Sequence, residues 1–284
     1  MQTITDNKYS MTFNSVFALS DHIEANEAQI TESAPFNEKA IMTMSEARDR
    51  ASEGGRWPEG AEKIKPTDID LGDFNIHSMA MPRPENAIVG YRPNVPAYLA
   101  GSPASMVRMS QTSQPNRLLK VAVHIGKAFN VDSATTFNRG NGILSCLNAL
   151  AAAGFAIELW AVWRNSYSNK AVHFDTLIKD STDTYSPDSI AFALCNDGFQ
   201  RRLVWSCLSI AYEQNKALAA ADQPYSRAPR ELIDGGYGNG KSAEYDDFDI
   251  SFGYVTSGER WTADNCVSKA RKIVETALNK KAGA

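Results

Sequence analysis

The sequence predicts an α/β protein, a three-layer sandwich with a mostly parallel sheet, because strand-like and helix-like segments alternate along the chain. The clearest evidence lies between Leu118 and Arg164. An apolar run at 118–126 is typical of a strand buried on both faces, and 155–164 is a second strand-like run. Between them, apolar residues recur with helical spacing from Gly142 until Gly154, a residue suited to end a helix. Strand, helix and strand in this order form a βαβ unit, whose strands must be parallel.

Other elements extend this unit on both sides. In the N-terminal part, residues 43–51 form a convincing helix, with Thr43 or Ser45 as its cap and Gly54-Gly55 after its end. Downstream, the patterns predict a strand at 171–179, a helix from 186 that is interrupted at 196–198 and continues to about 221, short strands at 230–234 and 248–255, and a closing amphipathic helix from 262. Helices and strands therefore continue to alternate up to the C-terminus.

We expect two parts in the chain. Residues 1–80 are polar and weakly periodic, and they are predicted to form an irregular N-terminal arm with short helices. Residues 81–284 are predicted to form the α/β core domain. Seven of the twelve prolines lie between residues 66 and 117, which excludes a long helix there. This proline-rich segment is expected to wrap around the core.

The composition is that of an ordinary soluble globular protein, with 43% hydrophobic and 22% charged residues. No apolar run approaches the roughly 18 residues of a membrane helix, and the N-terminus lacks the features of a secretory signal. The four cysteines are spaced too widely for a Cys-x-x-Cys pair, so free thiols in a reducing cytoplasm are expected. These observations predict no membrane contact.

The net charge of −4 is unevenly distributed. Residues 1–75 carry a net charge of −7, whereas residues 76–180 carry +5. A basic middle segment favours an anionic ligand bound near the centre of the chain. The alternative is a solvated α/β surface on which the charges cluster by chance.

Several short segments in order resemble an uncharacterised family of phage-encoded proteins. They are 44–47, 57–60, 95–103, 139–140, 153–159, Phe192 and 201–202. The strand, polar loop, Arg-Gly, helix and strand of the central unit also resemble a von Willebrand factor A-like core, within the Rossmann-like class. The chain further resembles the single-stranded-DNA-binding RNA polymerase cofactors of podoviruses that carry a virion polymerase. This resemblance implies single-stranded DNA and a phage RNA polymerase as partners, in the host cytoplasm.

Basic and aromatic residues cluster around the central unit. Cations that track phosphates and aromatic rings that stack on bases are the usual means of binding single-stranded DNA. Lys127 and Arg139 bracket the polar loop after the first strand, and Arg164, Tyr167 and Lys170 follow the second strand. Because the carboxyl ends of parallel strands share one edge of a sheet, we expect these groups to converge on one rim. The predicted nucleic-acid-binding residues are Arg108, Arg117, Lys127, Arg139, Trp163, Arg164, Tyr167, Lys170 and Lys241. Alternatively, Trp163 is a core residue and the cations are scattered.

Other motifs are less specific. Gly235–Ser242 matches the phosphate-loop pattern, but an acidic stretch and not a helix follows it, so nucleotide hydrolysis is not expected. A von Willebrand factor A-like core implies a metal site of the form Asp-x-Ser-x-Ser. Residues 124–128 stand at that place and contain no carboxylate, and Lys127 would repel a cation, so no metal is expected. His173 and Asp175 would share one face of a strand, but no nucleophile elbow accompanies them.

Three functions are compatible with these observations. The first is a non-catalytic, oligomeric single-stranded-DNA-binding protein that acts in transcription or replication and needs no cofactor. The second is an enzyme that binds a phosphorylated small molecule at the same rim, through His124 or Lys241. The third is a protein-interaction module in which residues 1–80 dock a partner.

Overall fold

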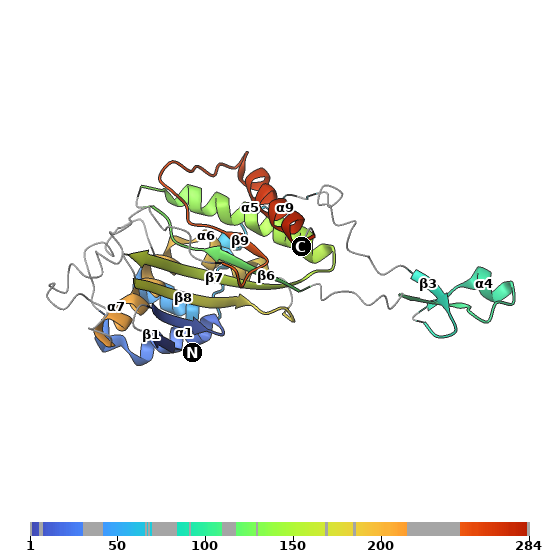
Figure 1. Ribbon diagram of the computed structural model, residues 1–284, viewed down its shortest axis with the longest axis horizontal. Coiled ribbons are helices and arrows are strands. Elements are labelled where there is room, and N and C mark those ends of the chain that lie inside the picture. The colour runs from blue at the N-terminus through green and yellow to red at the C-terminus, as the bar shows by residue number, and fades with distance from the viewer. Residues whose placement is uncertain are drawn as a thin grey trace. The chain divides into compact units, whose positions relative to one another are not determined.

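The computed structural model describes residues 2–5, 8–30, 42–65, 67, 69, 84–90, 92–109, 118–128, 130–167, 170–183, 186–214 and 245–282. It divides the chain into two compact units (Figure 1). Unit 1 consists of Met1–Asp70 and Leu118–Ala284, and unit 2 of Leu71–Arg117. The boundary expected after residue 80 is therefore wrong, because the first 70 residues belong with the core.

Unit 1 is built on a six-stranded sheet with the order β1-β2-β8-β7-β6-β9. The strands are β1 Gln2–Thr5, β2 Lys8–Phe13, β6 Leu118–His124, β7 Ala156–Tyr167, β8 Lys170–Lys179 and β9 Ile250–Phe252. Three of its pairings are parallel (β2 with β8, β6 with β7, β6 with β9), whereas β1 with β2 and β7 with β8 are antiparallel. The expected α/β sandwich with a mostly parallel sheet is confirmed.

The central βαβ unit is also confirmed, but its helix is longer than expected. Helix α5 covers Ser133–Ala152, and the Asp132 side chain caps it by accepting a hydrogen bond from the Thr135 backbone N–H at 2.7 Å. The polar segment before Gly142 therefore forms the first turns of the helix and not a loop. Its polar residues concealed the helical periodicity, and Asp132 was not recognised as the cap. Arg139 consequently projects from a helix.

Two glycines in α5 permit close contact with neighbouring helices. A Cβ at Gly140 would lie 2.3 Å from Cys195 Sγ, at the end of α6, and a Cβ at Gly142 would lie 2.4 Å from the carbonyl oxygen of Cys266, the first residue of α9. Only glycine fits such distances. Their role is to let neighbouring helices approach closely.

Strands β7 and β8 form a hairpin, with Tyr167 paired to Lys170. The parallel pairing of β7 with β6 reaches only to Val162, opposite His124. At about 3.3 Å per residue, the end of the hairpin lies roughly 16 Å beyond the end of β6. The ends of β6 and β7 therefore lie at different heights along the strand direction, and the residues that follow them do not share one edge of the sheet.

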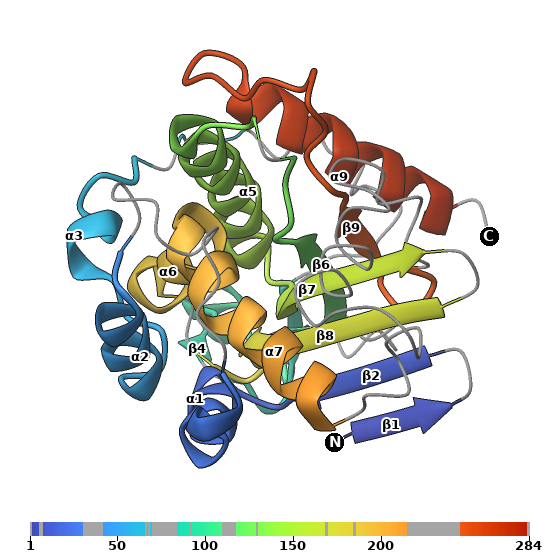
Figure 2. The same cartoon turned by 90° about the vertical axis from the view of Figure 1, so that its left-hand side faces the viewer.

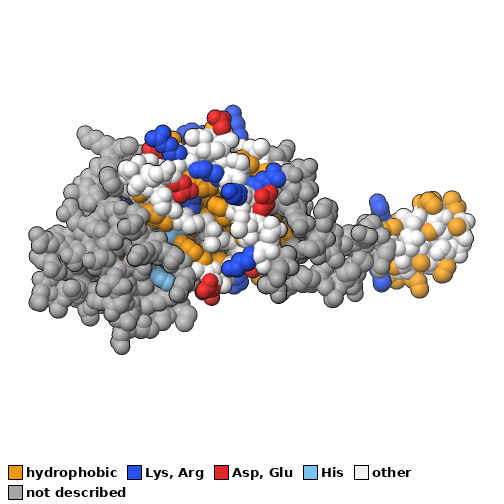
Figure 3. Space-filling view, turned by 45° about the horizontal axis from the view of Figure 1, so that its top comes forward, with side chains coloured by type: hydrophobic (Ala, Val, Ile, Leu, Met, Phe, Trp, Pro, Cys, Tyr) orange, Lys and Arg blue, Asp and Glu red, His pale blue; other side chains and the backbone are white. Residues whose placement is uncertain are grey.

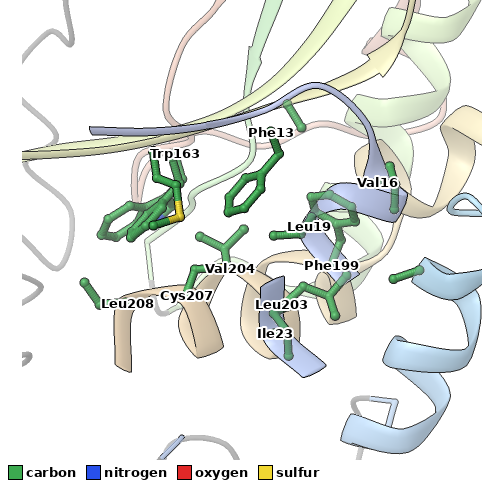
Figure 4. Packing of buried hydrophobic residues seen from close by; sticks show 14 of the residues in the cluster. Phe13, Val16, Leu19, Ile23, Trp163, Phe199, Leu203, Val204, Cys207 and Leu208 are labelled. Atoms are coloured by element: carbon green, nitrogen blue, oxygen red, sulfur yellow. The ribbon is translucent and has the colours of Figure 1, made fainter. Parts of the chain in front are cut away.

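The N-terminal residues expected in an arm lie in the core. Strand β2 lies in the interior of the sheet, and its alternate residues Tyr9, Met11 and Phe13 are buried. Helix α1 (Val16–Ala25) begins after Ser15, whose hydroxyl accepts from the Ala18 N–H. Its apolar residues join Trp163, Phe199 and Leu203 in one hydrophobic cluster (Figure 4). The start of the chain therefore completes the core.

Further helices surround this cluster (Figure 2). They are α2 Met44–Ser52, α3 Pro58–Ala61, α6 Pro187–Cys195, the π-helix η5 Phe199–Val204 and α7 Trp205–Gln214, with a short 3-10 turn η1 at Glu27–Gln29. The predicted helix at 43–51 is confirmed, with a capping box between Thr43 and Glu46. The predicted interruption at 196–198 separates α6 from η5. The closing helix is α9, Cys266–Ala282. The strand expected at 230–234 lies outside the described residues.

Unit 2, which holds most of the proline-rich segment, contains a small sheet of its own. Its strand order is β3-β5-β4, with β3 Pro84–Ala87, β4 Arg92–Pro93 and β5 Met106–Met109. Helix α4, Val95–Leu99, is capped by Asn94, whose side chain accepts from the Ala97 N–H. Both β3 and β4 pair with β5 in antiparallel fashion.

Candidate functional site

The Arg139 side chain forms hydrogen bonds with the carboxyl ends of two neighbouring strands, β6 and β9. Its Nη1 donates to the His124 carbonyl oxygen at 3.0 Å, and its Nη2 donates to those of Phe252 at 3.1 Å and Gly253 at 2.8 Å. These carbonyl groups end β6 and β9. The side chain is buried, and burial lowers the pKa of the guanidinium to about 10, so it remains charged at neutral pH. Arg139 is therefore a structural arginine whose donors face the interior.

His124 is equally committed to its surroundings. Its Nδ1 accepts from the Gly126 N–H at 2.9 Å, so its Nε2 is the protonated nitrogen and donates to the Arg164 carbonyl oxygen at 3.0 Å. Burial, reinforced by the charge of Arg139, lowers the pKa of the imidazole to about 4. His124 is a neutral, structural histidine and offers no base at the rim.

Lys127 is buried against a carboxylate from a distant part of the chain. Its Nζ lies 2.7 Å from Asp197 Oδ2, which also accepts from Ser133 Oγ at 2.6 Å. Burial lowers the pKa of the ammonium, and the charge of Asp197 opposes that shift. The pair links the loop after β6 to the segment between α6 and η5.

Arg164 is held on the sheet face opposite to Trp163. Its Nε lies 3.0 Å from Asp175 Oδ1 and its Nη2 lies 2.6 Å from Oδ2, the fork geometry of a strong ion pair. The rings of Tyr245 and Phe248 lie 5.8 and 5.3 Å from its guanidinium carbon. Burial lowers the pKa of Arg164, but the hydrogen bonds and charge of Asp175 more than offset it, so the pKa is raised. The Asp175 carboxylate therefore pairs with Arg164, although Asp175 and His173 lie on the same face of β8.

The predicted nucleic-acid-binding residues therefore do not form one exposed rim. Lys127, Arg139 and Arg164 lie near one another but are buried and internally paired, and Trp163 is a core residue only 5% exposed. Tyr167 and Lys170 stand at the distant end of the hairpin, and Arg108 lies in unit 2. Arg117, Lys241 and the glycine loop 235–242 lie outside the described residues. On the face shown in Figure 3, basic side chains are interspersed with acidic ones.

A pocket lies beside this cluster, beyond the carboxyl ends of β6 and β9. The chain passes from β6 outward to β7 and β8 and returns to β9 on the other side of β6, so the strand order reverses here. In α/β sheets ligands bind at such switch points. The cavity has a volume of about 460 Å³, within the range of small-molecule sites. We call it the switch-point pocket.

Its walls are the start of α5 and the loop before α9, and polar and apolar groups contribute to them in nearly equal measure. The lining residues are Asn130, Val131, Asp132, Ala134, Thr135, Asn138, Ser257, Glu259, Arg260, Trp261, Thr262 and Ala263. Asn138 joins the two walls by donating to the Trp261 carbonyl oxygen at 3.0 Å. Glu259 Oε1 accepts from Trp261 Nε1 at 2.9 Å. None of these residues is among the predicted binding residues, because the pocket depends on a loop far along the chain.

The charge of the pocket is slightly negative. Asp132 and Glu259 supply two carboxylates, and Arg260 supplies one guanidinium. The hydrogen bond from the Thr135 N–H keeps the pKa of Asp132 below its usual value, and the nearby charges of Lys127 and Arg260 act in the same direction. Asp132 is therefore ionised at neutral pH.

A family model described as a domain of unknown function, DUF7192, matches residues 2–279. The chain belongs to this family. No curated protein and no solved structure matches it. The DUF7192 description names no ligand or reaction, so the resemblance to phage DNA-binding cofactors stays a prediction.

The four cysteines of this DUF7192 chain are free and buried. Burial raises the pKa of Cys146 to about 12, and it raises the pKa of Cys195 and Cys207 still further, so these thiols are not nucleophiles. Among the described residues there is no cluster of three or more His, Cys, Asp or Glu side chains suited to a metal ion. None of the described helices is long and apolar enough to cross a bilayer.

Proposed function

We propose that the chain binds a small polar molecule, neutral or cationic, in the switch-point pocket. The observation that carries this proposal is the cavity of about 460 Å³ at the point where the strand order reverses. Its surplus of one negative charge disfavours a phosphorylated ligand and favours hydroxyl, amide or ammonium groups. None of the described residues that line the pocket is a histidine or a cysteine, which favours binding over catalysis.

The same geometry is unfavourable to single-stranded DNA along the rim. Lys127, Arg139 and Arg164 would have to break buried ion pairs or hydrogen bonds to reach a phosphate. Binding of single-stranded DNA in transcription or replication remains a prediction, and it would have to use surfaces other than Lys127, Arg139 and Arg164.

The proposal is tested by ligand-observed NMR with three panels: nucleosides and sugars, polyamines and basic amino acids, and phosphorylated metabolites. We expect ligands from the first two panels only. Ala134→Trp fills the pocket from α5 and removes no side-chain hydrogen bond, so binding should be lost. Ala152→Trp, an exposed alanine at the other end of the same helix, is the matched control and should bind normally.

The charge of the ligand is tested by Asp132→Asn, because asparagine caps a helix as well as aspartate does. A cationic ligand should bind up to about fivefold more weakly, as an exposed ion pair of about 1 kcal/mol implies, and a neutral ligand should be unaffected. Hits confined to the phosphorylated panel, or binding that survives Ala134→Trp, would refute the proposal. Binding of a labelled oligonucleotide that Ala134→Trp leaves unchanged would favour the DNA-binding prediction instead.

A further inference from the structure

Unit 2 exposes an unusual amount of apolar surface. Among the described residues, six large hydrophobic side chains are exposed, and five of them belong to unit 2. They are Ile88, Val89, Val95, Tyr98 and Leu99, with exposed fractions of 76%, 78%, 56%, 70% and 79%. Figure 3 shows hydrophobic side chains over much of this unit. We call these five residues the unit 2 apolar surface.

The hydrophobic core of unit 2 is too small to account for its folded structure by itself. Ala87 and Val107 are its buried hydrophobic residues among those described. Gly90 passes so close to β5 that a Cβ would lie 2.2 Å from the Val107 carbonyl oxygen, so the chain between β3 and β4 is packed tightly over the sheet. A three-stranded sheet with so small a core needs further burial for stability. The exposed apolar side chains are the surface available for it.

We propose that the unit 2 apolar surface is a homodimer contact, in which it packs against the same surface of a second copy of the chain. On α4, Val95, Tyr98 and Leu99 stand at positions i, i+3 and i+4 and so share one face of the helix. An isologous contact pairs this face with itself. This inference is independent of the switch-point pocket.

Charge and area both suit such a contact. Arg92 is the only charged residue between positions 86 and 107, so two copies bring few like charges together. Five side chains of this size present on the order of 500 Å² of apolar surface, typical of a functional patch. Two copies bury roughly 1,000 Å² together, the lower limit for a specific interface.

Other occupants fit less well. Phe17 is the one large hydrophobic residue exposed in the described part of unit 1, so that part offers no matching apolar area. A bilayer would leave the outer edges of β3 and β4 without hydrogen-bond partners in a medium that supplies none. A second copy supplies both apolar area and strand edges.

The test is light scattering coupled to size-exclusion chromatography of the full chain across a concentration series. We expect the wild type to be a dimer. Val89→Lys with Leu99→Lys should weaken dimerisation by about 100-fold or more, since buried anchors dominate interface energy. Ala152→Lys with Thr256→Lys adds the same charge at exposed sites of unit 1 and should leave the dimer intact. A wild type that stays monomeric at about 100 µM, well above the Kd of a specific dimer, overturns the proposal.

A second measurement decides the matter if the lysine variant misfolds. The four native thiols are buried, so Leu99→Cys introduces an exposed one. A short bismaleimide should cross-link Leu99→Cys chains in pairs, whereas Ala152→Cys should not cross-link. Failure of Leu99→Cys to cross-link while the protein is a dimer would place the interface elsewhere. A monomeric wild type that sediments with phosphatidylcholine–phosphatidylserine vesicles would show that the surface binds lipid.

Discussion

Arg139→Met should destabilise the fold strongly and leave any nucleic-acid affinity unchanged. The substitution removes the Arg139 donors from the buried carbonyl oxygens of His124 and Phe252 and from the partly buried one of Gly253. Each charge-assisted hydrogen bond contributes about 1.5–3 kcal/mol, and relief from burying the guanidinium recovers part of the total. We expect the free energy of unfolding to fall by about 3–5 kcal/mol.

The assay is urea unfolding followed by circular dichroism, with the slope of the transition as a check that both proteins unfold in one step. The melting temperature should fall by roughly 5–8 °C for a chain of this size. Arg271→Met is the matched control, because Arg271 is half-exposed on α9 and pairs with Glu275, so it should cost less than about 1 kcal/mol. A phosphate-binding Arg139 would give the opposite pattern, with stability within about 1 kcal/mol of wild type and weaker DNA binding, and that result would refute the structural role.

Two further predictions concern packing and pH. Gly140→Ala places a Cβ 2.3 Å from Cys195 Sγ and 2.7 Å from the Leu194 carbonyl oxygen, so it should cost about 1–3 kcal/mol in urea unfolding, whereas Gly258→Ala, with nothing within 4 Å, should cost far less. His124 has a folded-state pKa of about 4, below its unfolded value near 6.5, so protonation favours the unfolded state. Stability should be full above pH 6.5 and fall by about 1.4 kcal/mol per pH unit between pH 6.5 and 4, and His124→Asn should flatten that slope in unfolding titrations. An unchanged slope in the variant would show that His124 is not the responsible group.

The sequence predicts the elements of this fold better than it predicts their partners. The βαβ unit was recognisable because the apolar runs at β6 and β7 and the periodicity of α5 are local signals. The place of β2 in the sheet is not predictable in this way. Its pairing with β8 joins residues about 160 positions apart, and its short alternating pattern is weak by itself. The antiparallel pairing of β7 with β8 follows from no local motif either. Local patterns do not determine which strands become neighbours.

The candidate site shows a similar limit for charge. A basic middle segment was interpreted as a surface for an anion, yet Lys127, Arg139 and Arg164 are buried. The carbonyl groups that end parallel strands need donors, and Arg139 supplies three from one side chain. Sequence spacing cannot distinguish an arginine that satisfies strand ends from one that faces a phosphate. The switch-point pocket was missed for a different reason, because its second wall is a loop more than 120 positions further along the chain.

Lys127 shows how this chain differs from an α/β protein that binds a metal at the same place. The expectation of no metal rested on the absence of a carboxylate in residues 124–128, but the fold brings Asp197 there from between α6 and η5. An ammonium at 2.7 Å neutralises that carboxylate, and the Ser133 hydroxyl completes its shell on Oδ2. A divalent cation at Asp197 would have to displace the Lys127 ammonium, which carries charge of the same sign. Lys127→Met would instead leave Asp197 as a buried anion beside the Ser133 hydroxyl. The Lys127 ammonium therefore neutralises Asp197, as a bound cation would in a metal-binding α/β protein. The adjoining switch-point pocket remains open to an organic ligand.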